Sequence, residues 1–216
     1  MKYLSIDTET TGLDPNIDQI LSIGIVIEDT NNQISLEDLP KLHLIIVRER
    51  MHGNLFSLNM NKNLISLINQ WNISDQDKRS DIEKENKSVF CREEDVCSII
   101  FKFLYKNNML NPLISSGIGD VYPTITSKTP KTQLTIAGKN FATFDKLFLE
   151  NLPRWRQLFN IRQRIIDPAI LFTDFAVDES LPSLSVCKER AGFESEVSHN
   201  AVEDAIDIVK LLRIYY

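Results

Sequence analysis

Apolar residues in the first fifty positions come in short runs separated by polar, turn-forming residues, a pattern typical of β-strands. Three such runs predict strands at residues 2–7, 19–28 and 42–48. The segments between them leave no room for helices, so each strand is expected to run antiparallel to the one before it. The beginning of the chain therefore predicts an antiparallel meander.

From residue 61 onward the apolar positions recur every three or four residues, which is the spacing of amphipathic helices. Helices are predicted on this basis at residues 61–71, 93–106, 144–150, 183–191 and 200–214. Two further strands are predicted at residues 134–137 and 164–167, the second of them stopped by Pro168. A meander followed by strands that alternate with helices favours an α/β fold in which helices flank a mixed sheet.

Two segments lack both patterns. Residues 74–88 are charged and nearly free of apolar side chains, which predicts an exposed connector. Residues 107–133 are rich in Gly, Pro, Ser and Thr and predict a long insertion with room for a hairpin. A chain of 216 residues is long enough for one well-filled core and short for two, so residues 1–216 are expected to form a single domain.

The composition is that of an ordinary globular protein, with 43% hydrophobic and 25% charged residues. No apolar run approaches the length needed to cross a membrane, and the strand-like pattern begins at once, without a secretion signal. Cys91, Cys97 and Cys187 are odd in number and lack metal-site spacing, so reduced thiols are expected. These features together predict a cytoplasmic protein with no membrane partner.

The net charge of −6 argues against a large, sequence-indifferent grip on duplex DNA, which needs many contacts with phosphates. It is compatible with a nucleic-acid enzyme in which bound cations supply positive charge locally. The net charge therefore favours a protein that binds the end of a nucleic-acid chain over one that wraps a long polymer.

Three short polar motifs follow one another along the chain: Asp7-Thr-Glu-Thr-Thr-Gly, Asn140-Phe-Ala-Thr-Phe-Asp and His199-Asn-Ala-Val-Glu-Asp. In the first motif, Asp7 and Glu9 lie two residues apart at the end of a predicted strand, so both side chains leave the same face and can reach one cation. The spacing alone is common, because Asp81 and Glu83 have it inside the charged segment. Taken alone, the first motif favours a solvated strand end over a metal site.

The second and third motifs stand next to predicted helices. Asn140 and Asp145 lie between a strand and a helix, where active sites of open α/β sheets gather, although a turn residue and a helix-start acid would look the same. Ser198 or His199 is the expected cap of the last helix, which leaves His199 on the loop before it. At roughly 100° per residue, Asp204 falls about 60° from the centre of the buried stripe and can face a cleft. The alternative is that His199 is only a helix cap and Asp204 is an acid on the protein surface.

Carboxylates from these motifs would repel one another on converging, unless cations lie between them. Oxygen ligands of this kind suit hard cations such as Mg²⁺ or Mn²⁺. Two such cations are the usual equipment for hydrolysis of a phosphodiester bond. The joint pattern therefore predicts a nuclease that uses two divalent cations.

In their order and context, the three motifs resemble those of the DEDDh group of 3′–5′ exonucleases, a superfamily that includes proofreading exonucleases, oligoribonuclease and RNase T. The likeness extends over residues 1–212, apart from 74–88 and 107–133. It implies a ribonuclease H-like fold with a central five-stranded sheet. It also implies a catalytic base and four metal-site acids, which would be His199, Asp7, Glu9, Asp145 and Asp204. The middle Asp stands five residues after the Asn, as in the oligoribonuclease-like branch, rather than four as in many proofreading members.

The resemblance further implies stepwise release of nucleoside 5′-monophosphates from the 3′ end of single-stranded DNA or RNA. Substrate contacts are expected from five residues, Thr10, Thr11, Gly12, Leu13 and Asn140. Residues 53–61 look like a substrate-side element of some relatives, but the sequence favours an apolar lead-in to the next helix. No reader of the 2′-hydroxyl group and no aromatic stacking platform stands out, so both DNA and RNA are candidate substrates.

Three alternatives share these sequence features. One is a nucleic-acid-end binding module with little catalysis, and another is a two-metal endonuclease of the same fold. The third is an α/β interaction domain whose acids are coincidental, which the joint occurrence of three ordered motifs argues against. Metal-dependent turnover separates an exonuclease from a binding module, and a circular substrate separates it from an endonuclease.

Overall fold

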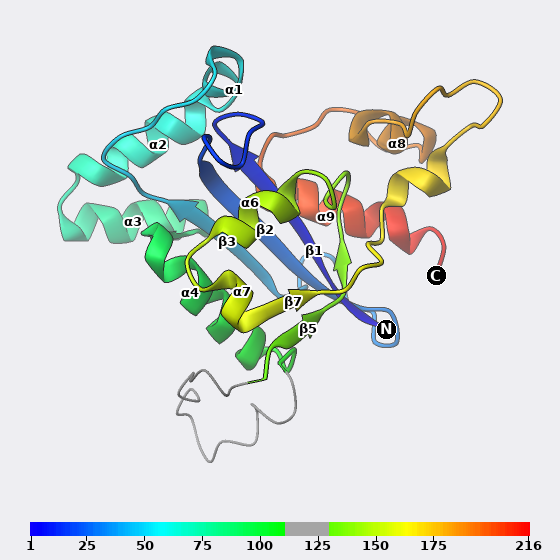
Figure 1. The fold of residues 1–216 in the computed structure, drawn as a ribbon, viewed down its shortest axis with the longest axis horizontal. Helices are drawn as coiled ribbons and strands as arrows, with labels where there is room; N and C mark the ends of the chain where they lie inside the picture. Colours follow the sequence, from blue (N-terminus) through cyan, green and yellow to red (C-terminus); the bar gives the residue numbers. More distant parts are fainter. Residues whose placement is uncertain (111–129) are drawn as a thin grey trace.

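The computed structural model describes residues 1–110 and 130–216, which are built around a five-stranded sheet in the order β4-β3-β2-β1-β6 (Figure 1). The strands are β1 (Lys2–Thr10), β2 (Ile20–Asp29), β3 (Lys41–Ile46), β4 (Val89–Cys91) and β6 (Ile136–Ala137). β1, β2 and β3 form the predicted antiparallel meander, while β4 joins β3 and β6 joins β1 in parallel. The predicted α/β fold with a mixed five-stranded sheet is confirmed.

Helices cover both faces of this sheet, as Figure 1 shows. They are α4 (Glu93–Lys106), α6 (Asp145–Asn151), α7 (Trp155–Leu158) and α9 (Ala201–Arg213). α9 packs on the face that carries Tyr3 and Val26, whereas the other three share a core with Ile6 and Ile25. Because successive strand residues point to opposite faces, the odd-numbered residues of β1 all face α9.

The segment predicted to be an exposed connector, residues 74–88, is mostly helical. It contains α3, which follows α1 and α2 in a helical layer: α1 (Leu55–Met60), α2 (Lys62–Ile73) and α3 (Gln76–Asn86). The side chain of Asp75 caps α3, Ile82 is buried, and the guanidinium of Arg79 lies 4.2 Å from the centre of the Trp71 ring. This helix is held by one buried side chain, a capping side chain and a cation–π contact. A prediction that looks for a stripe of apolar residues does not find such a helix.

The predicted fourth and fifth strands are arranged differently in the structure. Residues 134–137 divide between β6 and β5 (Thr132–Leu134), and β5 pairs with β7 (Phe159–Ile161) in a separate two-stranded parallel sheet. Of residues 164–167, Ile166 alone forms a bridge, to the end of β6, so the prediction of a fifth strand there was wrong. The sequence does not predict β4 and β7, because three residues are too few to establish a strand pattern.

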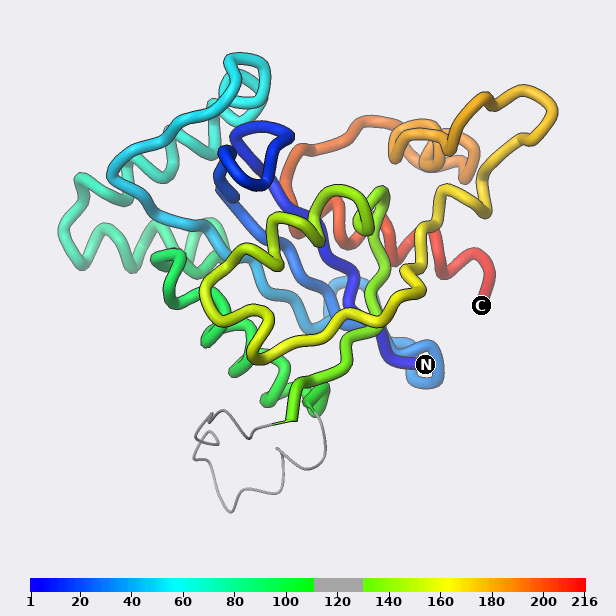
Figure 2. The backbone as a smooth tube through the Cα atoms, viewed as in Figure 1, coloured from blue at the N-terminus to red at the C-terminus, as the bar shows by residue number. Residues whose placement is uncertain are grey.

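The remaining described elements are a 3-10 helix, η1 (Pro168–Phe172), and α8 (Leu184–Arg190). Figure 2 shows that both ends of the chain lie on the same side of the molecule, where the hydroxyl groups of Tyr3 and Tyr216 are 2.8 Å apart. The hairpin expected within residues 107–133 would fall mainly on 111–129, which lie outside the described residues. Among the described helices, none combines the length and the apolar character needed to span a bilayer.

The close approach of α9 to the sheet depends on Gly24. A Cβ atom at this position would overlap the backbone of Ala201 and Val202, so any larger residue must push the start of α9 away. Gly24 pairs with Asp7 in the register between β1 and β2, which places this contact beside the predicted acids.

Replacement of Gly24 by Ala is expected to destabilise the protein by about 1–3 kcal/mol, because over-packing outweighs the gain of about 0.5–1 kcal/mol from a better strand residue. Chemical denaturation followed by circular dichroism measures this change. Ser22→Ala, two residues away on the same face, is the matched control. The hydroxyl of Ser22 is buried without a partner, so its loss should leave the stability nearly unchanged. Equal stability of both variants would show that this contact does not hold α9.

Candidate functional site

The long first strand carries two of the predicted acids to the face covered by α9. β1 continues to Thr10, so Asp7 and Glu9 lie inside the strand rather than at its end. They pair with Gly24 and Ser22 of β2, and both of their side chains leave the same face. Glu9 is buried and Asp7 is partly buried.

Asp204 completes a compact group of three carboxylates. It lies in the first turn of α9 and is buried, whereas its neighbour Glu203 is exposed, as the helix pattern predicts. One carboxylate oxygen from each of Asp7, Glu9 and Asp204 lies within 4.8 Å of the other two. Three acidic oxygens at this separation can serve as ligands of one divalent cation.

Asp145 adjoins this group. It is the first residue of α6 and is buried, and its Oδ1 accepts a hydrogen bond of 2.7 Å from the hydroxyl of Thr8 in β1. Its charge is close enough to Asp7 to contribute to the raised pKa of that carboxyl. The structure therefore gathers all four predicted acids, three in one ligand group and the fourth beside it.

Burial and mutual repulsion make these carboxyl groups hard to ionise. Burial raises the pKa of Glu9 and of Asp145 to about 7, and that of Asp204 to about 6. Burial also raises the pKa of Asp7 well above its usual range, with further contributions from the charges of the other three acids. Without a compensating cation, the group holds protons that exposed carboxyl groups would have released.

The hydrogen bonds that reach these acids come from neutral groups. They are donated by the hydroxyl groups of Thr8 and Ser198 and by the amide of Asn61. Neutral donors favour the ionised form but leave the net negative charge in place. Among the described residues, none of these acids forms an ion pair, and such a set of carboxylate oxygens fits the ligand preference of Mg²⁺ or Mn²⁺.

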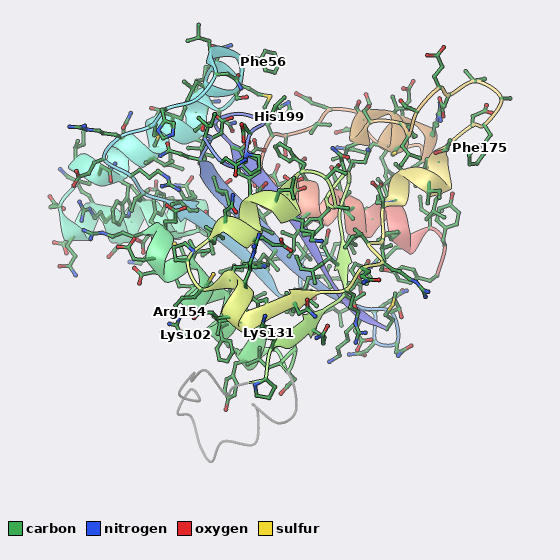
Figure 3. All side chains as sticks on the ribbon, in the orientation of Figure 1. Phe56, Lys102, Lys131, Arg154, Phe175 and His199 are labelled. Carbon is green, nitrogen blue, oxygen red and sulfur yellow. The ribbon has the colours of Figure 1, made fainter. Side chains whose placement is uncertain are left out.

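His199 lies on the loop between α8 and α9, at the end of the sheet where β1 finishes (Figure 3). The cap of α9 is neither Ser198 nor His199 but Asn200, whose side chain accepts hydrogen bonds from backbone N–H groups of the first turn. His199 has a φ of 51°, a left-handed conformation that is uncommon outside Gly. Its side chain is exposed, and its charge opposes the burial that raises the pKa of Asp204.

A buried ion pair holds the loop that carries His199. The ammonium group of Lys188 on α8 donates to the carbonyl oxygen of Glu196 in this loop and lies 2.6 Å from Oδ2 of Asp207 on α9. The side chains of Lys188 and Asp207 are only 9% and 10% exposed. Lys210 lies 2.6 Å from the second oxygen of Asp207. Lys188 therefore ties α8, the loop and α9 together just before His199.

A hollow of about 390 Å³ opens beside Glu9. Its lining includes Leu13, Phe56 and Met60, with exposed fractions of 76%, 78% and 38%, and also Phe144. Large apolar side chains are exposed here next to a carboxylate. Such a hollow suits a ligand with a flat ring joined to polar groups.

The other residues predicted to bind substrate make local contacts. Thr10 lines the hollow, and its hydroxyl donates to the carbonyl of Gly12. Thr11 is fully buried and is held by hydrogen bonds to neighbouring turns. Asn140 is exposed, and its side-chain oxygen accepts a hydrogen bond of 2.6 Å from the hydroxyl of Thr143. Of these residues, Leu13 and Thr10 adjoin the acids most directly.

Phe56, Met60 and Phe144 are not among the predicted site residues. The sequence favours residues 53–61 as an apolar segment that leads into the next helix. In the structure these residues contain a helix of their own, α1, which forms one wall of the hollow. The signal in the sequence was the pair Leu55 and Phe56, two large apolar side chains that a helix of six residues leaves exposed.

Comparison with solved structures identifies the fold. A structure of E. coli exonuclease I in complex with a dT13 oligonucleotide matches 99% of this chain and 40% of its own, with a TM-score of 0.54 and 16% identity. A product-bound structure of exonuclease I matches 99% and 43%, with a TM-score of 0.53 and 14% identity. The chain has a ribonuclease H-like fold. It spans about two fifths of the exonuclease I chains, and no family model or curated protein sequence matches it.

The raised pKa values make the stability of the metal-free protein depend on pH. In the folded state Glu9, Asp145 and Asp204 release their protons at higher pH than in the unfolded chain, where ordinary values apply. Their stabilising contribution is complete below about pH 4 and is lost as the pH rises through about 6 to 7. Thermal unfolding in chelator should therefore show a midpoint that falls from about pH 5 to about pH 8. Mg²⁺ should raise the midpoint most at the alkaline end, and no effect there would contradict a metal site.

Replacement of Asp7 by Asn should raise the unfolding midpoint of the metal-free protein near pH 8, because it removes one of four repelling charges. At this chain length, about 1 kcal/mol of relief corresponds to about 2–4 °C. The same variant should lose most of its stabilisation by Mg²⁺. Asp81→Asn is the matched control, because Asp81 has the same spacing to a Glu but is 72% exposed on α3. A lower midpoint for Asp7→Asn would show that the acids do not repel one another.

Proposed function

We propose that this protein is a metal-dependent 3′–5′ exonuclease that releases nucleoside 5′-monophosphates from single-stranded DNA or RNA. The observation that carries the proposal is the convergence of Asp7, Glu9 and Asp204 within 4.8 Å, with Asp145 beside them. Buried acids that repel one another destabilise the fold, so their arrangement needs a functional reason.

Two divalent cations, Mg²⁺ or Mn²⁺, are the proposed cofactors. Asp7, Glu9 and Asp204 would hold the first, and Asp7 together with Asp145 would hold the second. When bound, the cations would make a water molecule more acidic and stabilise charge on the departing 3′ oxygen. The hydroxyl of Thr8 donates to Oδ1 of Asp145, which fixes the orientation of this carboxylate near Asp7.

His199 is the proposed general base. A histidine can accept a proton near neutral pH, and this one lies on a loop beside Asp204 rather than inside a helix. The tie from Lys188 to Glu196 keeps the loop near the acids while leaving the side chain of His199 exposed.

The hollow beside Glu9 is proposed to hold the 3′-terminal nucleotide. Its base would lie against Leu13 and Phe56, and its sugar would face Thr10 and Glu9. Contact with an apolar wall is tolerant of base identity, which suits an enzyme that removes every nucleotide in turn.

The solved structures support a nucleic-acid strand and a divalent cation as ligands. Exonuclease I occurs in complex with single-stranded DNA in a zinc-bound form that matches 99% of this chain, with a TM-score of 0.51 and 17% identity. The likeness extends to the fold that holds the acids, and the activity is inferred from the acids themselves.

Activity is tested with a single-stranded oligonucleotide that carries a label at its 5′ end, in the presence of Mg²⁺ or Mn²⁺. A ladder that shortens from the 3′ end should appear and should vanish with chelator. A circular strand should stay intact, because it offers no end, whereas an endonuclease would cut it. A nucleic-acid-end binding module would retain the strand without shortening it.

Asp7→Asn should abolish this activity, whereas Asp81→Asn should leave it unchanged. His199→Ala should lower kcat by about 10²–10⁴-fold, the usual contribution of general-base catalysis, with a much smaller change in KM. Steady-state rates on the labelled strand measure both constants. Undiminished turnover of Asp7→Asn would reject the assigned site, and equal losses in kcat and affinity for His199→Ala would reject its role as a base.

Phe56→Ala should raise the KM for single strands by about 5–150-fold, because stacking of one base on an aromatic side chain is worth about 1–3 kcal/mol. Leu55→Ala is the matched control. Leu55 is the preceding residue of α1 and is 86% exposed, but it does not line the hollow. Equal KM values for the two variants would place the terminal base elsewhere.

A further inference from the structure

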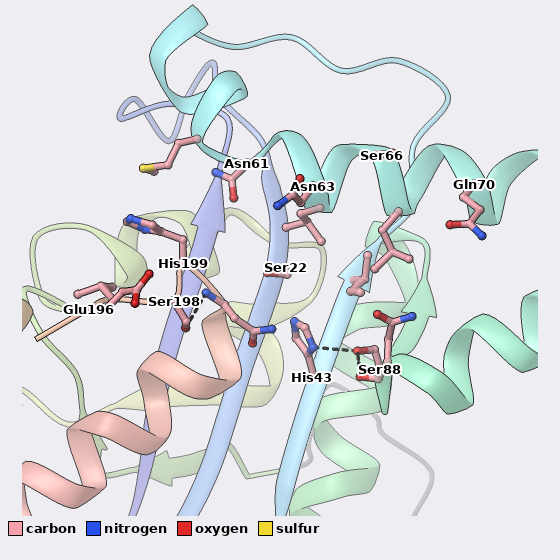
Figure 4. Close-up of a pocket in the computed structure, with 17 residues that line it drawn as sticks. Ser22, His43, Asn61, Asn63, Ser66, Gln70, Ser88, Glu196, Ser198 and His199 are labelled. Carbon is pink, nitrogen blue, oxygen red and sulfur yellow. Dashed lines mark hydrogen bonds between the residues drawn. The ribbon is translucent and has the colours of Figure 1, made fainter. Parts of the chain in front are cut away.

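A second depression, which we call the amide groove, leads away from the acids on the α9 side of the sheet (Figure 4). It has a volume of about 680 Å³ and lies between α2 and the loop before α9. Its polar lining includes Asn61, Asn63, Gln70, Ser88 and His199. The predictions from the sequence give this surface no role.

The amide groove is almost free of charge. Within the described part of the chain, the residues that line it include no Lys or Arg, and Glu196 is its one carboxylate. His43 on its floor shares a hydrogen bond of 2.8 Å with the hydroxyl of Ser88. Burial lowers the pKa of His43 to about 4, so this imidazole is neutral near pH 7. The groove therefore offers hydrogen-bonding groups without offering countercharges for phosphates.

Two buried polar atoms next to the groove have no hydrogen-bond partner. They are Oγ of Ser22 and Oδ1 of Asn61, in residues that are only 1% and 3% exposed. Both residues line the groove. Buried polar atoms in folded proteins nearly always have a partner, so these two indicate a place where a ligand, or water that accompanies it, completes the bonding.

The groove is continuous with the proposed active site. Met60 lines both the amide groove and the hollow beside Glu9. Asn61, the next residue, lies against the carboxylate of Glu9 and also lines the groove. His199 stands on the opposite wall. A strand whose last nucleotide occupies the hollow would pass the acids and continue into the groove.

We propose that the amide groove binds the nucleotides on the 5′ side of the scissile bond and holds them by their bases and sugars, with their phosphates facing solvent. This inference rests on the proposed function, because the strand direction is set by the terminal-nucleotide hollow. The side chains of Asn63 and Gln70 on α2 both donate and accept hydrogen bonds, so they can pair with the edges of different bases. The proposed ligand is therefore single-stranded nucleic acid with exposed bases, not duplex.

Binding is measured separately from cleavage by fluorescence anisotropy with Mg²⁺. The probe is a thymidine decamer that carries a 5′ label and a 3′-terminal linkage that resists hydrolysis. The double variant Asn63→Ala/Gln70→Ala should raise the Kd by about tenfold, as expected for two lost hydrogen bonds. Asn69→Ala is the matched control, because Asn69 is exposed on α2 but lines a different surface, beside Trp71. Its Kd should equal that of the wild type.

A second probe removes the bases at the positions that precede the terminal nucleotide and keeps every phosphate. Wild-type protein should bind it about tenfold more weakly than the intact decamer, whereas the double variant should bind both alike. A fourfold increase in salt should weaken wild-type binding less than about threefold, the effect of at most one phosphate contact. Tight binding of the abasic probe, a steep salt dependence, or a double variant with wild-type affinity would each overturn the proposal.

The two proposals can fail separately. If binding depends on the bases but an ordinary decamer is not shortened, the proposal for the groove is supported and the proposed nuclease activity is rejected. Shortening of the decamer by a protein whose binding ignores the bases would support the nuclease and reject the groove.

Discussion

Helix α9 can bring Asp204 to Asp7 and Glu9 only because β2 has no side chain at Gly24, where the two elements touch. This close packing has two consequences with opposite signs. It buries apolar surface between α9 and the sheet, which stabilises the fold. It also forces carboxylates together in a place that water reaches poorly, which destabilises it. The position of α9 is therefore a compromise, which protonation of the acids relieves at low pH and a bound cation would relieve at higher pH.

That compromise explains why the site is lined as it is. A lysine or arginine among the acids would neutralise them and stabilise the empty protein, but it would also compete with a cation for the same oxygens. The neutral donors Thr8, Asn61 and Ser198 orient the carboxylates without cancelling their charge. Stability given up at one site in this way is a common feature of enzymes, and the large apolar core on the other face of the sheet offsets it.

The sequence predicts the acids better than their surroundings, for physical reasons. Strand alternation fixes the shared face of Asp7 and Glu9, and helical periodicity turns Asp204 inward, so local geometry alone brings these side chains to the right surfaces. The role of Phe56 depends on how α1 sits over the end of β1, and the amide groove depends on the space between α2 and α9. Neither distance is encoded in a local pattern. The short strand β4 and the weakly apolar helix α3 are not predicted from the sequence for the same reason, because tertiary contacts define both elements.

The ion pair of Lys188 with Asp207 also determines how far His199 can travel. The loop is anchored at Glu196 on one side and at the Asn200 cap on the other, with three residues between these points. One of the three, Ser198, is itself hydrogen-bonded to Asp204. Three residues reach at most about 10 Å when fully extended, which limits the arc over which the imidazole can swing. The reach of His199 is thereby linked to a salt bridge that lies outside the group of acids.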